Sequence, residues 1–252
     1  MTSDRRFATI RSDFTSKGVR CSADLYLPAG AYRPPVVVMA HGFGAERTFG
    51  LPAYARRFAE RGLAVYLFDY RGFGDSDGEP RNYVDARRHL ADWRAAMAHV
   101  RALHEVDGTR LALWGTSYSG GHAIATAASD PAVTAIVAQV PYVDPFGLWC
   151  WKDPGYLARG LGHGLWDLAR AALRLPPHYV KLAGQPDEFA VLNTPDTWSG
   201  FQTILPEGSD WQNRCPARVA LTTLFYRPAR SAAHVHCPAL ILIGEHDSIL
   251  SA

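Results

Sequence analysis

The stretch LALWGTSYSGG, residues 111–121, decides the fold, because a buried strand here runs directly into a helix. The apolar run LALW is followed by a turn of small residues, and HAIATAA then begins a helical segment. Ser117 therefore lies at the corner between strand and helix. A nucleophilic serine is typically held in such a tight, strained turn, which needs small residues two positions before and after it, here Gly115 and Ser119.

The motif departs from G-x-S-x-G because Ser119 replaces the second glycine. A shifted frame would make Ser119 the nucleophile, but it would lie a full step into the helix, so Ser117 is preferred. A glycine-rich corner of this kind also binds phosphate or merely turns the chain in other proteins. A dinucleotide site is disfavoured, because no G-x-G-x-x-G follows the first parallel strand.

Further apolar runs of strand length lie on both sides of this stretch, at residues 36–40, 63–68, 133–140 and 239–243. Their unbroken apolar character is typical of strands buried on both faces. Between them, residues 84–104 have apolar residues at helical spacing, which form a stripe along one face of the predicted helix. Asp92 and Arg101 lie outside this apolar stripe, and His89 lies on the exposed or flanking side. This alternation predicts an α/β protein with a mostly parallel sheet and helices on both faces.

The chain divides into three segments by composition. Residues 1–143 form the first part of the core, opening with an antiparallel hairpin over residues 7–27 around Ser16-Lys17-Gly18. Residues 144–235 are rich in Pro, Gly and Trp and are interpreted as an inserted lid. Residues 236–252 return to the core with one more strand and an acidic turn.

The turn His41-Gly42-Phe43-Gly44 ends the first parallel strand. A glycine-flanked turn exposes backbone N–H groups toward the neighbouring strand end. The amides of Phe43 and Tyr118 are therefore predicted to hold a developing oxyanion. His41 is interpreted as a structural turn residue rather than a base.

Composition favours a single globular domain with a small-molecule substrate. The chain of 252 residues is 48% hydrophobic, and its net charge of +2 comes from basic and acidic residues spread along the sequence, so no nucleic acid or membrane partner is expected. Cys21, Cys150, Cys215 and Cys237 lack the spacing of a zinc or redox motif. We expect reduced thiols, no cofactor, no metal and a cytoplasmic location.

Four motifs in register, VVVMAHGFG, VYLFDYRGFGDSDG, LWGTSYSGG and ALILIGEHD, resemble the serine α/β-hydrolase superfamily, particularly its dienelactone-hydrolase-like and acyl-peptidase-like esterases. The likeness covers residues 7–143 and 237–252. It implies attack by a serine on an ester, thioester or amide, followed by hydrolysis of an acyl-enzyme.

The same resemblance implies an acid after the strand at 239–243 and a histidine after one further strand. Asp247 is the first candidate acid, Glu245 a possible substitute, and Asp144 the alternative acid position of some relatives. The histidine is expected beyond Ala252, in a final strand and helix missing from this chain, and a rearranged triad with His246 ranks below that. Residues 239–243 would then form an exposed edge, which a second copy could cover in a homodimer.

The substrate is expected to be small and apolar. Aromatic and aliphatic residues of the lid either line an acyl pocket or form the lid's own core: Phe146, Leu148, Trp149, Trp151 and Trp166. The sequence thus predicts a carboxylic-ester hydrolase. A non-catalytic binding protein and an acyltransferase on the same fold remain as alternatives.

Overall fold

The computed structural model describes residues 6–146, 152–245 and 247. Its strands are β1 (Phe7–Arg11), β2 (Phe14–Ser16), β3 (Val19–Cys21), β4 (Ala23–Pro28), β5 (Pro35–Ala40), β6 (Ala64–Phe68), β7 (Asp107–Thr116), β8 (Val133–Gln139), β9 (Tyr179–Ala183), β10 (Ala190–Leu192), β11 (Arg214–Pro216) and β12 (Ala239–Leu242). Its helices are α1 (Leu51–Ala59), α2 (Ala86–Ala102), α3 (Tyr118–Ser129), α5 (Pro154–Ala172), α6 (Thr197–Ile204), α7 (Val219–Thr222), and the 3-10 turns η1 (Thr223–Phe225) and η2 (Pro228–His234).

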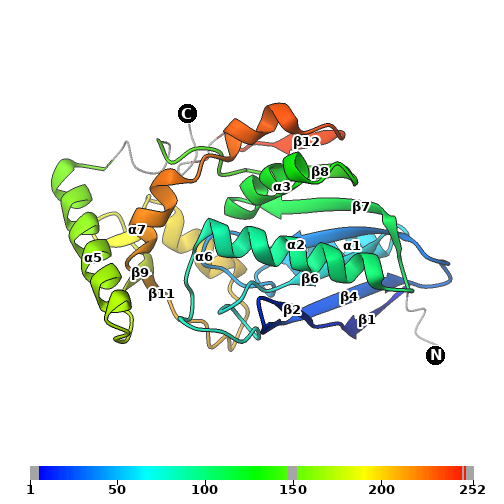
Figure 1. The fold of residues 1–252 in the computed structure, drawn as a ribbon, viewed down its shortest axis with the longest axis horizontal. Coiled ribbons are helices and arrows are strands. Elements are labelled where there is room, and N and C mark those ends of the chain that lie inside the picture. The colour runs from blue at the N-terminus through cyan, green and yellow to red at the C-terminus, as the bar shows by residue number, and fades with distance from the viewer. Residues whose placement is uncertain (1–5, 147–151, 246, 248–252) are drawn as a thin grey trace.

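A seven-stranded sheet in the order β1-β4-β6-β5-β7-β8-β12 forms the centre of the molecule (Figure 1). The pairs from β6 to β12 are all parallel, whereas β4 pairs antiparallel with both β1 and β6. The mostly parallel sheet predicted from the solid apolar runs is therefore confirmed.

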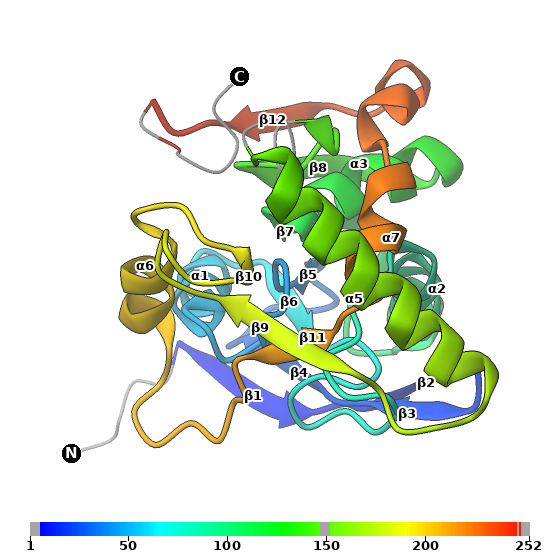
Figure 2. The same ribbon diagram turned by 90° about the vertical axis from the view of Figure 1, so that its left-hand side faces the viewer.

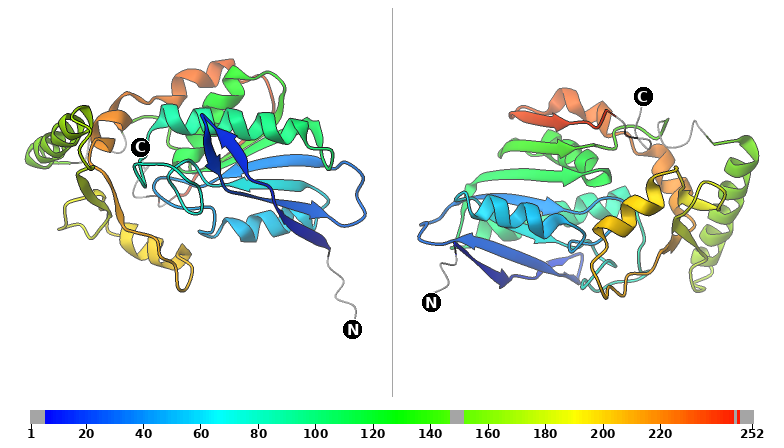
Figure 3. Two further views of the ribbon diagram at one scale, coloured as in Figure 1. Left: turned by 60° about the horizontal axis from the view of Figure 1, so that its bottom comes forward. Right: turned by 180° about the vertical axis from the view of Figure 1, so that it is seen from behind.

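Helices cover both faces of this sheet, and each face has its own apolar core. In Figure 1, α2 and α3 lie in front of the sheet, and the right-hand view of Figure 3 shows α1 on the opposite face. Trp93, Met97 and Val100 of α2 belong to the larger core, while Leu51 and Ala55 of α1 belong to the smaller one. The core on the α1 side is the smaller one because α1 is short and offers only 9 residues for burial.

The N-terminal hairpin turns where the sequence predicts, at Lys17 and Gly18, which have φ of 51° and 79°. β2 and β3 pair across this turn and form a separate two-stranded sheet. β1 and β4 continue the same antiparallel register, from Arg11 opposite Asp24 to Phe7 opposite Pro28, and form one edge of the central sheet, so the hairpin predicted over residues 7–27 is confirmed.

The chain between β8 and β12 builds a second, three-stranded sheet in the order β10-β9-β11, flanked by α5 and α6. Figure 2 shows α5, β9 and β11 crossing in front of the ends of the central strands. We call the described residues 152–234 the lid. No helix in the described part of the chain has the length and hydropathy needed to cross a bilayer.

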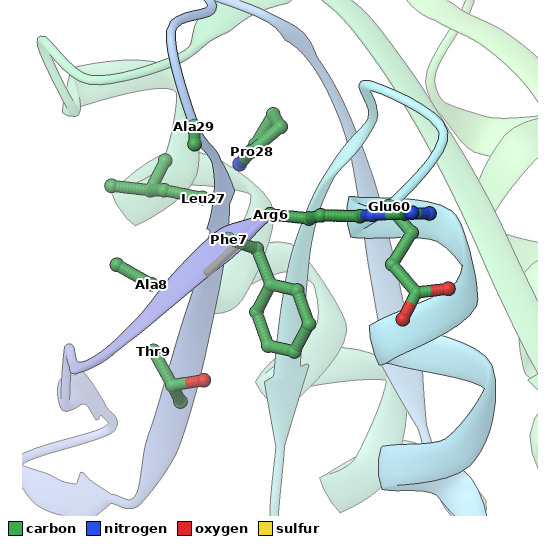
Figure 4. A pocket seen from close by; sticks show the side chains of 8 residues that line it. All are labelled: Arg6, Phe7, Ala8, Thr9, Leu27, Pro28, Ala29 and Glu60. Atoms are coloured by element: carbon green, nitrogen blue, oxygen red, sulfur yellow. The ribbon is translucent and has the colours of Figure 1, made fainter. Parts of the chain in front are cut away.

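The two edges of the central sheet differ. At the β12 edge, Leu240, Ile241 and Leu242 are all exposed. At the opposite edge, side chains from β1, β4 and the end of α1 surround a surface hollow (Figure 4). That hollow is separated from β7 by β4, β6 and β5, so it is not part of the corner at Ser117.

Candidate active site

Ser117 occupies the corner between β7 and α3, in a backbone conformation that side-chain-bearing residues rarely adopt. Its φ is 53° and its ψ is −121°. The Ser117 N–H donates to the Gln139 carbonyl at 2.8 Å, and its own carbonyl accepts from the Tyr142 amide at 2.9 Å. The segment after β8 thus holds the corner from both sides, which is what a strained residue needs in order to persist.

Glycines make this close packing possible. A Cβ on Gly115 would lie 2.1 Å from the Ser119 carbonyl oxygen, and one on Gly121 would lie 2.2 Å from the Tyr142 carbonyl oxygen. A Cβ on Gly42 would lie 3.1 Å from the Ser117 Cβ. The corner therefore closes only with glycine at 115 and 121, and the turn after β5 lies directly against Ser117.

The structure separates the two serines of the motif. The Ser119 side chain is fully buried, and its Oγ is 2.9 Å from the Tyr70 hydroxyl, which also accepts from Trp93 Nε1 at 2.9 Å. Ser117, in contrast, is partly exposed. Ser119 thus belongs to the packing beneath the corner, and Ser117 is the serine of the motif that remains partly exposed.

The turn that follows β5 brings the predicted oxyanion donors to this corner. The Phe43 and Tyr118 rings meet edge to face with centroids 5.4 Å apart. Among the described residues, neither the Phe43 amide nor the Tyr118 amide is used in the hydrogen bonds that stabilise the corner and the turn. Both amides are therefore available, and their role as oxyanion donors remains a prediction.

His41 lies beneath this turn and has no access to solvent. Its Nδ1 is 3.1 Å from the Gly42 carbonyl, and its Nε2 is 3.6 Å from Asp69 Oδ1. Burial lowers the pKa of His41 to about 3 and raises the pKa of Asp69 to about 6. Arg47 donates to Asp69 from both its backbone and its guanidinium. The geometry gives His41 a structural role as a neutral side chain.

Two other histidines, His89 of α2 and His122 of α3, are buried next to each other. The His89 ring stacks on Tyr70 at 3.9 Å, and its Nδ1 is 3.2 Å from His122 Nε2. His122 Nδ1 is 2.7 Å from the Tyr226 hydroxyl, which the lid contributes. Burial lowers the pKa of both histidines, that of His122 to about 3.

The helical stripe was therefore wrong about two residues of α2. His89 and Asp92 are buried, although the pattern placed both away from the core. The physical reason is pairing: the Asp92 carboxylate accepts from the Arg71 backbone at 3.1 Å and from its guanidinium. A buried carboxylate that accepts such hydrogen bonds is tolerated. The periodicity of α2 cannot identify Arg71 as its partner.

The candidate acids lie after two neighbouring strands. β12 is parallel to β8, so Asp247 follows β12 at the same edge of the sheet as Ser117. Its amide donates to the Gly244 carbonyl at 3.4 Å, which forms the predicted acidic turn, and Glu245 is exposed in that turn. Asp144 Oδ1 accepts from the Phe146 amide at 2.8 Å, and its Oδ2 lies 3.5 Å from Arg227 Nε.

The predicted acyl-pocket residues are only partly described. Phe146 and Trp166 are 74% and 56% exposed, so these two residues are not the lid's own core. Leu148, Trp149 and Trp151, like His246, lie outside the described residues. Two lid tryptophans that were not candidates, Trp198 and Trp211, pack against the main core instead.

The known proteins to which this chain is similar include α/β hydrolases, and their names indicate several different activities. The family model for X-Pro dipeptidyl-peptidases (S15 family) matches residues 17–182. Quorum-quenching protein AidA of Acinetobacter baumannii (strain MDR-ZJ06) is 38% identical over 242 residues, which cover 96% of this chain and 80% of that protein. Thiohydrolase aneE of Aspergillus aculeatus (strain ATCC 16872 / CBS 172.66 / WB 5094) is 36% identical over 130 residues, covering 52% of this chain and 40% of that protein.

Among solved structures, the α/β hydrolase GrgF from Penicillium sp. sh18 superposes with a TM-score of 0.83 at 26% identity. The superposition covers 97% of this chain and 82% of that chain. It includes the central sheet and the lid, because nearly the whole chain is aligned.

Proposed function

Because the chain belongs to the X-Pro dipeptidyl-peptidase (S15) family and has the α/β-hydrolase fold, we propose that it is a serine hydrolase that cleaves a carboxylic ester, thioester or amide through an acyl-enzyme. The superfamily resemblance of its motifs is confirmed. The observation that carries the proposal is Ser117, a partly exposed serine in a strained corner, with the turn at residues 42–44 packed against it.

In the proposed reaction, Ser117 Oγ attacks the carbonyl carbon of the substrate while a base removes its proton. The negative charge that develops on the carbonyl oxygen accepts hydrogen bonds from the Phe43 and Tyr118 amides. Collapse of this intermediate expels the alcohol, thiol or amine, which takes the proton, and leaves an acyl group on Ser117. Water then attacks the acyl group in the same way, which releases the carboxylic acid and returns the proton to Ser117.

Asp247 is proposed to orient the base and to stabilise its protonated form, with Asp144 as the alternative. Asp247 is favoured because the segment ALILIGEHD, which contains β12, resembles the strand and acid turn of the superfamily. The base is proposed to be a histidine outside the described residues. Three of the described histidines, His41, His89 and His122, are poorly suited because they are buried with lowered pKa values.

A small, uncharged acyl substrate is proposed. Phe146 and Trp166 expose aromatic surface on the lid side of the molecule, and the chain carries little net charge. The thiohydrolase among the relatives favours a thioester among the three bond types. A transferase would share every step except the last, in which another nucleophile replaces water.

The test is covalent labelling with a fluorophosphonate, followed by intact mass. Wild type is expected to gain one adduct, and Ser117→Ala to gain none and to lose hydrolysis of p-nitrophenyl acetate, by a factor on the order of 10⁴ to 10⁶. Ser119→Ala is the matched control and should still be labelled. A Ser117→Ala variant that retains the adduct would exclude Ser117 as the nucleophile, and a wild type that contains the proposed base but stays unlabelled and inactive would favour a binding protein.

A further inference from the structure

The lid makes a direct contact with the turn that carries the Phe43 amide. Trp211 lies between α6 and β11, and its Nε1 donates to the Gly44 carbonyl at 2.9 Å across a sequence separation of 167 residues. Gly44 directly follows Phe43. One hydrogen bond therefore connects the lid to the segment proposed to hold the oxyanion.

The indole of Trp211 is fixed between the lid and the core. Phe201 of α6 stacks on it with ring centroids 5.5 Å apart and planes 17° from parallel. Phe49, a buried residue of the loop after β5, meets it edge to face at 5.6 Å. Rings packed on two sides leave the indole little freedom, so its N–H is aimed at Gly44 before any substrate binds.

Leu182 of β9 presses on the same turn from the lid side. A Cβ on Gly44 would lie 1.9 Å from Leu182 Cδ1, and Gly44 has a φ of +64°. Glycine is thus required here both for backbone conformation and for space. Leu182 is fully buried, so the contact is part of the packed core.

The segment that carries Trp211 is itself attached at two further points. Asn213 accepts from the Ala183 amide at 2.8 Å and donates to the Ala183 carbonyl at 2.7 Å, which joins the segment to β9. Asn82, in the loop before α2, donates to the Gln212 carbonyl at 3.1 Å. Trp211 and Leu182 therefore act on the turn as one rigid unit.

We propose that Trp211 and Leu182 are positioning residues, through which the lid holds the turn at residues 42–44 so that the Phe43 amide points at the oxyanion. This inference rests on the proposed function. An oxyanion donor acts only within hydrogen-bond distance of the place where charge develops, so a small displacement of the turn weakens the transition state more than the bound substrate. The lid thereby contributes to catalysis without touching the reacting atoms.

The main experiment uses Trp211→Phe in the full-length protein, which removes the indole N–H and keeps an aromatic ring between Phe201 and Phe49. The matched control is Trp198→Phe, at a partly exposed tryptophan of α6 that has no proposed role in the site. For p-nitrophenyl acetate, kcat should fall about tenfold with KM unchanged within about twofold, less than the 10² to 10³ seen when a donor is deleted outright. Fluorophosphonate labelling should slow to a similar degree.

Amide hydrogen exchange at residues 43–45 provides a readout that does not depend on activity. Exchange there should speed up at least about threefold in Trp211→Phe and stay unchanged in Trp198→Phe. Leu182→Val is a second variant, which shortens the side chain that contacts Gly44, with Leu192→Val of β10 as its control. It should produce the same two effects to a smaller extent.

Two results would overturn the inference: exchange and kcat at wild-type values in both positioning variants, or an effect on KM alone. An inactive, unlabelled wild type would instead defeat the proposed function. Hydrogen exchange would still decide, in that case, whether the lid holds the turn.

Discussion

At the scale of single residues, the corner contains a second strained position besides Ser117. Val140, directly after β8, has a φ of 39°, which is a rare conformation for a β-branched residue. Its amide donates to the Leu242 carbonyl at 2.7 Å, while Gln139 and Tyr142 on either side of it hydrogen-bond to Ser117. Val140 thus joins the nucleophile corner to the strand that leads to Asp247.

This conformation predicts an unusual response to glycine. Val140→Gly should leave the free energy of unfolding unchanged or raise it by up to about 1 kcal/mol, because relief of about 1–3 kcal/mol of strain offsets the entropy of the unfolded chain. Val137→Gly, a control in regular β8 backbone, should lower it by at least about 1 kcal/mol. Urea unfolding of both variants measures this. Equal destabilisation by the two substitutions would show that Val140 stores no strain.

At the scale of elements, the lid helix α5 buries very few of its side chains. Only Gly164 and Asp167 are buried along its 19 residues. The Asp167 carboxylate accepts from the His178 amide at 2.7 Å, from the Arg218 amide at 3.0 Å and from Arg218 Nε at 2.7 Å. This carboxylate therefore joins α5 to the residue before β9 and to the start of α7, in addition to the contacts of the Tyr156 hydroxyl with the Ala190 amide and of His163 with His178.

Asp167→Asn should consequently detach α5 more than it harms the core. The amide has the shape of the carboxylate but lacks its charge, which leaves Arg218 without a counter-ion at a cost on the order of 3 kcal/mol. Limited proteolysis should cut the connection at residues 173–178 faster than in wild type, while Asp187→Asn, at an exposed lid position, should not change the rate. An unchanged cleavage pattern would mean that other contacts hold α5.

At the scale of the whole molecule, the buried histidines tie the sheet loops, α2, α3 and the lid together, and they make the fold sensitive to acid. His122 has a pKa of about 3 in the folded protein because of burial, below its ordinary 6.5. Between these values the unfolded chain binds a proton at this position and the folded chain does not. Stability contributed by the neutral side chain is therefore complete above about pH 6.5 and falls as the pH drops.

The matched variant is His122→Gln, compared with wild type by urea unfolding at pH 7, 6, 5 and 4. The difference in unfolding free energy should move in favour of the variant by about 1.4 kcal/mol for each pH unit below 6. Burial raises the pKa values of Glu46 and Asp69 to about 7 and about 6, which gives stability the opposite pH dependence. Both groups are present in both proteins, so they cancel in the difference. A constant difference across this range would show that folding does not lower the pKa of His122.

Much of this architecture follows from sequence alone. The apolar runs determine the strands, because a strand buried on both faces needs no polar residues. The glycines around Ser117 and in the turn at residues 41–44 mark the places where backbones approach closely. These are local properties of a few consecutive residues, so the fold class, the position of the corner and the candidate nucleophile could be predicted.

Only the tertiary structure decided which polar groups are buried and what the lid contacts. Ser117 and Ser119 differ in exposure because Tyr70 covers one of them, and His89 and Asp92 are buried because Tyr70, His122 and Arg71 pair with them. No local pattern connects Trp211 to Gly44. The physical reason is the same in each case: burial and hydrogen bonding depend on residues far apart in the chain, which meet only when the sheet and the lid are assembled.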